Sequence, residues 1–144
     1  MSATDDVDRF VERYHLALGE FVKGNPEPVK EMVSHKDDVT LANPLGPPAR
    51  GWDEVAKTIE HAASTIRDGE IIGFEIVSKL VTPELAYILE IERQEAKLGA
   101  NDELTLFALR VTMIFHPEDG QWKLVHRHAD PITTPQPVES LIQE

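Results

Sequence analysis

The sequence predicts an α+β fold, in which three N-terminal helices pack on one face of a curved, mainly antiparallel β-sheet. The first half of the chain has apolar residues at helical spacings of three and four, interrupted by one short strand. The second half has four long consecutive strands in which apolar residues recur at every second position. Consecutive strands of this kind pair antiparallel and leave one face for the helices.

The first two helices are predicted from apolar stripes and from residues that cap helices. Ser2 or Thr4 can cap the first helix, and Gly24 ends it. Asn25 and Pro26 then serve as the cap and the first residue of a short second helix. The stripes consist of Val7, Phe10, Val11, Tyr14, Leu18, Phe21 and Val22 in the first helix, and of Val29, Met32 and Val33 in the second.

A bend rich in proline and glycine separates these helices from the third. The short strand 39–43 leads into the bend 44–51, which a helix cannot enter because of its prolines. A third helix is predicted from Trp52 to Ile66, with Gly69 as its end. From residue 71 the apolar period becomes two, which predicts strands at 71–81 and 85–95.

The last two strands are predicted to form one long hairpin between Glu103 and Asp130. Residues 117–120 favour a turn, and Gly120 supplies the positive φ of a three-residue loop with a bulge. In that register Pro117 faces Gln121 across the loop.

This register makes one face of the hairpin polar in its middle, because Arg110 then pairs with His128 and Thr112 with His126. We expect this polar face to lie against the helices and their pocket. The opposite face carries Phe107, Leu109, Val111, Met113, Phe115 and Val125.

Composition limits the possible partners. A chain of 144 residues predicts one domain, expected at 1–131, followed by a proline-containing tail at 132–144. The net charge of -12 argues against nucleic acid and anionic membranes as partners. The absence of cysteine excludes disulfides and thiolate chemistry. No apolar signal core or stretch of ~18 apolar residues occurs, so a cytoplasmic protein without a membrane partner is expected.

Two segments resemble a known superfamily. LANPLGPPARG at 41–51 resembles the short strand and bend of ketosteroid isomerases, and RVTMIF with DGQWKLVHRHAD resembles the last strands of SnoaL-like and kinase-association domains. The chain therefore resembles the nuclear transport factor 2-like superfamily, which includes ketosteroid isomerase, polyketide cyclases, scytalone dehydratase and limonene epoxide hydrolase. The resemblance implies a cone-shaped α+β fold with a pocket for a small organic molecule.

The residues of ketosteroid isomerase chemistry are largely missing from the matching positions. Asn43 stands where those enzymes have the carboxylate base, and an amide does not take a proton at neutral pH. The strand 105–115 lacks their protonated aspartic acid. Tyr14 lies on the helix that carries their oxyanion tyrosine, about three residues out of register, so we expect Tyr14 and Asn43 to contact a ligand rather than to isomerise a steroid.

Arg110 is predicted to lie in a strand between Leu109 and Val111, where a guanidinium needs acceptors. It can form a buried ion pair with an acid of a neighbouring strand, such as Glu90 or Glu92. It can also bind the carboxylate or enolate of a ligand. The two roles are compatible.

His126 and His128 share a face of the last strand and are the candidate acid and base. They can equally be hydrogen-bonded interior residues. No third ligand stands at a recognisable spacing, so neither a metal nor another cofactor is expected. Asp130 can orient His128, pair with Arg110 or cap the turn at Pro131.

Other residues complete the predicted site. Thr112 shares the polar face, and Trp52 beside the bend is either a wall of the pocket or part of the core. The other four histidines, His15, His35, His61 and His116, are expected on the surface.

Two functions remain open at this stage. The first is isomerase, cyclase or dehydratase chemistry on a carboxylate- or carbonyl-bearing molecule, and the second is ligand binding or assembly without catalysis. We also expect a homodimer, because the apolar face of the hairpin needs a cover if the helices lie on the polar face.

Overall fold

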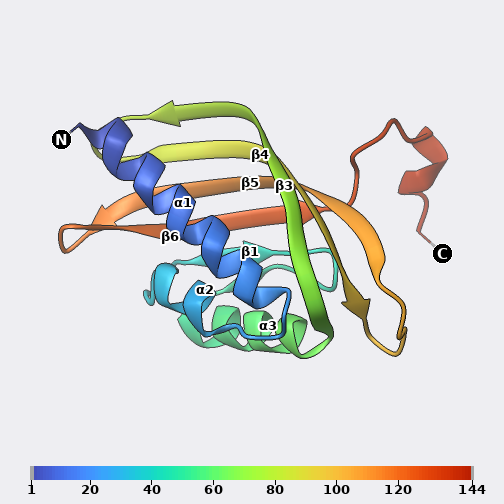
Figure 1. Cartoon of the computed structure of the whole chain (residues 1–144). Helices are drawn as coiled ribbons and strands as arrows, with labels where there is room; N and C mark the ends of the chain where they lie inside the picture. Colours follow the sequence, from blue (N-terminus) through green and yellow to red (C-terminus); the bar gives the residue numbers. More distant parts are fainter. Residues whose placement is uncertain (1, 144) are drawn as a thin grey trace.

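The α+β prediction is confirmed by the computed structural model, which describes residues 2–143. Helices α1, α2 and α3 pack on one face of a six-stranded sheet with the strand order β2-β1-β6-β5-β4-β3 (Figure 1). All strand pairs are antiparallel except β1 with β6. The elements are α1 Ala3–Phe21, α2 Glu27–Met32, β1 Thr40–Ala42, β2 Ala49–Arg50, α3 Trp52–Ser64, β3 Ile66–Val81, β4 Ala86–Leu98, β5 Thr105–Glu118, β6 Gln121–Asp130 and the short η1 Val138–Leu141.

Helix α1 begins and packs as its sequence predicts. The Ser2 side chain caps it by accepting a hydrogen bond from the Asp5 backbone N–H at 3.2 Å. Its buried stripe includes Phe10 and Tyr14, and the Phe10 ring meets the Phe115 ring of β5 edge to face at 5.1 Å. This contact fixes α1 across the sheet.

Helix α3 is shorter than predicted, because it ends at Ser64 and the chain enters β3 at Ile66. Gly69 therefore lies within a strand and does not end the helix. Its N–H donates to the Val22 carbonyl at 2.9 Å, and a Cβ at this position would lie 2.6 Å from that oxygen. Glycine is needed here because the end of α1 passes so close to β3.

The predicted register of the β5–β6 hairpin is wrong in two respects. The turn has two residues, Asp119 and Gly120, both with positive φ, as in a type I′ turn. A bulge then lies at Val125, because Phe115 pairs with Leu124 whereas Ile114 pairs with His126. Consequently Thr112 pairs with His128, and Arg110 pairs with Asp130.

The prediction of which face the helices cover is also wrong. Val111, Met113 and Phe115 are fully buried in the core with the helices, whereas the Arg110 side chain is half exposed on the opposite face. We call the helix-covered face of the sheet the inner face and the other the outer face. Burying the apolar side of β5 yields far more hydrophobic stabilisation than burying its polar side. The apolar face of β5 is therefore covered by the helices of the same chain and is not left bare for a dimer.

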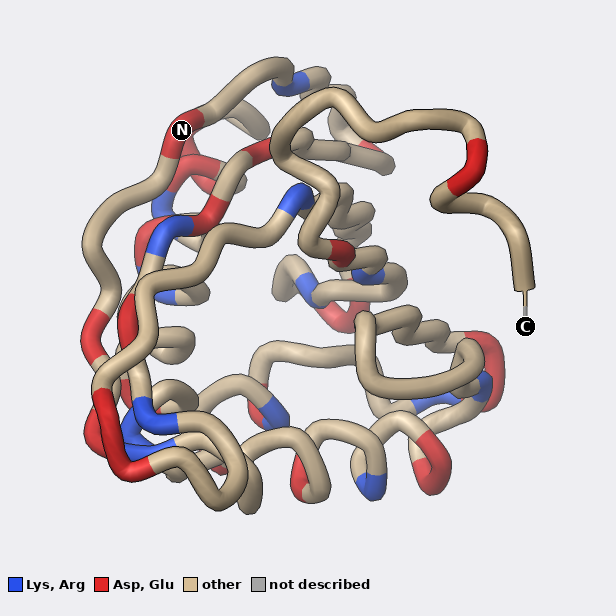
Figure 2. Tube along the Cα trace, turned by 90° about the vertical axis from the view of Figure 1, so that its right-hand side faces the viewer, with Lys and Arg blue, Asp and Glu red and all other residues tan. Residues whose placement is uncertain are grey.

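The chain after β6 forms an arm that leaves the body of the protein (Figures 1 and 2). Its apolar side chains are exposed, with Val138 at 73% and Leu141 at 77%. None of the helices formed by residues 2–143 is long and apolar enough to span a membrane.

Candidate functional site

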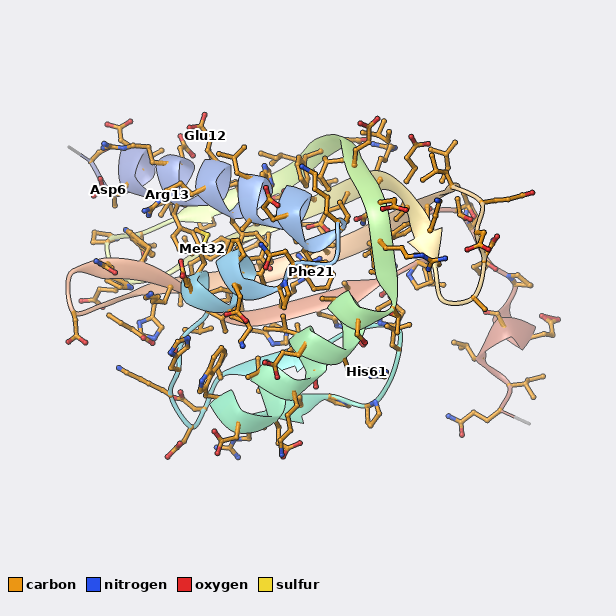
Figure 3. The ribbon with its side chains drawn as sticks, turned by 60° about the horizontal axis from the view of Figure 1, so that its bottom comes forward. Asp6, Glu12, Arg13, Phe21, Met32 and His61 are labelled. Carbon is orange, nitrogen blue, oxygen red and sulfur yellow. The ribbon has the colours of Figure 1, made fainter. Side chains whose placement is uncertain are left out.

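A cavity of about 630 Å³ opens between the helices and the inner face of the sheet. Most of its lining is aliphatic or aromatic, and it includes His61 near the end of α3, which Figure 3 labels. Phe21, also labelled there, ends α1 on the wall of the same cavity. The other lining residues are Tyr14, Leu18, Val29, Val33, Thr40, Leu41, Asn43, Pro44, Leu45, Val55, Ile59, Ala62, Thr65, Ile66, Leu98, Gly99, Phe107, Leu109, Leu124, Arg127 and Ala129.

Arg127 is the charged side chain of this lining that lies inside the protein. The bulge at Val125 places Arg127 on the inner face together with Leu124, although the two differ in parity along β6. Its guanidinium donates two hydrogen bonds to the Glu92 carboxylate, Nη2 to Oε1 at 2.8 Å and Nη1 to Oε2 at 2.9 Å. The Arg127 side chain is 11% exposed and that of Glu92 is 1% exposed, so this is a buried ion pair.

Glu90 and His15 extend this pair into a cluster of four buried or half-buried groups. Nε2 of His15 lies 2.9 Å and 3.2 Å from the two oxygens of Glu90, which is fully buried. The His15 ring stacks on Phe74 at a centroid distance of 3.5 Å. His15 is therefore not the surface residue predicted from the sequence, since its side chain is only 18% exposed.

The pKa values of the two carboxyl groups in the cluster are shifted in opposite directions. Burial raises the pKa of Glu90, and the neighbouring Glu92 carboxylate raises it further. Burial also acts to raise the pKa of Glu92, but the Arg127 guanidinium outweighs burial and holds that pKa below its ordinary value. Glu92 is thus the ionised partner of Arg127, and Glu90 is the carboxyl that holds a proton more readily.

Tyr14 is the second polar side chain at the inner part of the cavity. The Arg127 guanidinium carbon lies 5.9 Å from the centre of its ring. Burial raises the pKa of the Tyr14 hydroxyl to about 12, although the Arg127 charge acts to lower it. The hydroxyl therefore keeps its proton at neutral pH and can donate a hydrogen bond into the cavity.

The predicted catalytic residues lie together, but on the outer face rather than in this cavity. Arg110 donates to both oxygens of Asp130 at 2.8 to 3.3 Å, so the predicted pairing with Glu90 or Glu92 is wrong. His128 Nε2 lies 3.6 Å from the same carboxylate, with its side chain 55% exposed. His126 Nδ1 is 2.7 Å from the Thr40 hydroxyl, and burial, together with the charge of His128, lowers its pKa.

The remaining predicted ligand contacts are divided between the two faces. Tyr14 and Asn43 do line the cavity. Thr112 pairs with His128 and shares the outer face with it. Trp52 packs against the core and stacks on His35 at 3.7 Å, and it is not part of the cavity wall. Among residues 2–143 no group of three or more metal-ligating side chains is placed to hold an ion.

Sequence reasoning missed Arg127 and His15 as site residues, and it named Glu90 and Glu92 only as candidate partners of Arg110. Glu90 and Glu92 share the buried face of β4 with Ile88 and Gln94, which puts two acids on one face of an interior strand. Such a pair requires a buried cation or a shared proton. That pattern was available in the sequence and could have prompted a search for the partner of the two acids.

Similarity to solved structures defines the class of protein to which this fold belongs. A nuclear transport factor 2-like superfamily protein from Salmonella enterica has a TM-score of 0.77 and 15% identity, covering 95% of this chain and 96% of its own. A ketosteroid isomerase-like protein from Erwinia carotovora has a TM-score of 0.73 and 19% identity, covering 90% and 96%. A protein of the same fold family from Streptomyces avermitilis has a TM-score of 0.73 and 16% identity, and the match covers 92% of this chain and 98% of the other. At these identities the likeness establishes the fold alone.

The sequence itself assigns the family within this class. The SnoaL-like domain family matches residues 7–133, and the chain belongs to this family. No curated protein matches the chain.

Proposed function

We propose that the protein binds a small, largely hydrocarbon molecule in the inner cavity, with Tyr14 and Arg127 as its polar contacts. The observation that carries the proposal is an open cavity of about 630 Å³ whose apolar wall contains a buried cation and a buried hydroxyl. Natural ligand sites have volumes of about 300 to 1,000 Å³ and combine an apolar wall with few polar groups.

Binding without proton transfer is the better supported of the two functions expected from the sequence. Isomerase, cyclase or dehydratase chemistry needs a group that exchanges a proton with the ligand near neutral pH. Tyr14 and Arg127 both keep their protons there, because both pKa values are raised. His61 is the one histidine of the cavity wall, and it lies at the exposed end of α3. His126 and His128 lie on the outer face and are not part of the cavity lining.

The proposal is tested with 2-acetonaphthone, an uncharged aromatic ketone, titrated into the full chain by calorimetry. The Ala62→Phe substitution fills the cavity from α3, so we expect the affinity to fall at least about tenfold. Lys57→Phe is the matched control, because Lys57 lies on the same helix with a side chain 73% exposed. Equal affinity in wild type and Ala62→Phe, or no binding to wild type, would contradict the proposal.

We also propose that the chain forms a homodimer through the outer face of the sheet. Support comes from apolar side chains that are exposed on and near the outer face, including Leu106 of β5 at 72% and Leu104 at 53%. Sedimentation at micromolar concentration tests this, and a monomer there would contradict it.

A further inference from the structure

The guanidinium of Arg127 already has a protein carboxylate as its partner. Both terminal nitrogens donate to Glu92, and Nη1 also lies 3.4 Å from the Met113 sulfur. A ligand that enters the cavity therefore meets a cation whose charge is compensated. The guanidinium has further N–H donors beyond the two that bond Glu92, so it can donate to a ligand oxygen, but it has no surplus positive charge.

The neighbouring groups do not supply a surplus charge either. Nε2 of His15 faces both oxygens of the fully buried Glu90, so this imidazole already has a carboxyl partner. The Arg127–Glu92 pair is matched in the same way, so neither pair offers a ligand an unmatched positive charge. The net charge of -12 over the whole chain opposes an incoming anion as well.

A ligand carboxylate would thus add an uncompensated negative charge to a buried site, which is costly in a low-dielectric interior. An uncharged acceptor oxygen meets no such penalty. The Tyr14 hydroxyl and the accessible edge of Arg127 are donors, and a ketone, ester or amide oxygen is complementary to them. The aliphatic and aromatic wall suits a hydrocarbon frame.

We propose that Glu92 determines the charge selectivity of this cavity: by neutralising Arg127 it makes the site accept uncharged carbonyl compounds and reject the corresponding carboxylates. This inference rests on the proposed function and narrows its ligand class. Glu92 acts through Arg127 and is a positioning and specificity residue that does not line the cavity itself.

The test compares 2-acetonaphthone with 2-naphthoate, which share a ring system and differ in a neutral ketone against a carboxylate. Both are titrated into the full chain at pH 7.5. We expect wild type to bind the ketone at least about tenfold more tightly than the carboxylate. In Glu92→Gln the ratio of ketone affinity to carboxylate affinity should fall by about tenfold or more. Glutamine keeps the shape and an acceptor oxygen for Arg127 but removes the competing charge.

Asp130→Asn is the matched control, because it removes the carboxylate charge of the outer Arg110–Asp130 pair, and neither residue of that pair lines the cavity. The ratio of its affinity for the ketone to its affinity for the carboxylate should stay at the wild-type value. Wild type that binds naphthoate as tightly as the ketone overturns the inference, as does an unchanged ratio in folded Glu92→Gln. If Glu92→Gln does not fold, the wild-type ratio decides alone. Binding of neither probe to wild type overturns the proposed function and the inference with it.

Discussion

Strands β4, β5 and β6 carry two arginine–carboxylate pairs with similar hydrogen-bond lengths and opposite surroundings. On the inner face Arg127 holds Glu92 at 2.8 and 2.9 Å, with side chains 11% and 1% exposed. On the outer face Arg110 holds Asp130 at 2.8 to 3.3 Å, with side chains 50% and 22% exposed.

Burial, and not bond length, decides what each pair does. Water screens the charges of the outer pair, so this pair contributes little to the free energy of unfolding. The inner pair lies in a low-dielectric region where a lone charge is costly, so each partner depends on the other. For the same reason only the inner pair controls the charge that a ligand in the cavity meets.

The largest expected effect is on stability. Glu92→Ala leaves Arg127 buried without its carboxylate, and we expect the free energy of unfolding to fall by about 3 to 5 kcal/mol. Asp130→Ala breaks the outer pair and should cost about 1 kcal/mol or less. Urea unfolding of both variants measures the difference. Equal losses would show that burial does not distinguish the two pairs.

The pH dependence of stability sharpens the comparison within the inner cluster. The pKa of Glu92 is lowered on folding, so its stabilisation is present above the ordinary value near 4.5 and is lost as pH falls through the folded value. The defect of Glu92→Gln should therefore shrink on acidification.

The pKa of Glu90 is raised on folding, so its contribution to stability changes with pH in the opposite direction. Its stabilisation is present below about 4.5 and is lost as pH rises through the folded value. Glu90→Gln should consequently gain stability relative to wild type as pH rises from 4.5 to 8. Parallel curves for wild type, Glu90→Gln and Glu92→Gln would contradict the assigned shifts.

The fold was predictable because the apolar periods of the chain are long and consistent. The helical stripe from Val7 to Val22 and the alternation along β4 and β5 each agree with one packing arrangement. The end of α3 was not predictable. Glycine often ends a helix, but Gly69 instead lets the backbone of β3 approach the Val22 carbonyl closely.

The site was not predictable because it depends on a single bulge. No residue type marks Val125 as a bulge, yet without it Leu124 and Arg127 could not both face inward. The direction of β5 could have been decided from its own pattern, since Val111, Met113 and Phe115 form a continuous apolar row. Arg110 does not need the inner face, because on the outer face its side chain reaches both water and the Asp130 carboxylate.

A smaller effect is expected when the hydroxyl at the cavity is removed. Tyr14→Phe keeps the ring and its packing but deletes one donor, so the affinity for 2-acetonaphthone should fall about fivefold, equivalent to about 1 kcal/mol. Calorimetry measures the change. An unaltered affinity would mean that the ketone oxygen does not contact Tyr14.

The smallest effect is expected on the outer face. His128→Ala removes a side chain that is 55% exposed and is not part of the cavity wall. The affinity for the ketone should stay within about twofold of wild type, as for independent sites. A larger loss in the same titration would return the outer-face residues to the candidate site.

The most direct measurement is a crystal structure of the protein with 2-acetonaphthone bound. We expect the ring between α1, α3 and the inner face of the sheet, with the ketone oxygen within hydrogen-bond distance of Tyr14 or Arg127. A ligand seated at Arg110 and His128 on the outer face, with the inner cavity empty, would contradict it.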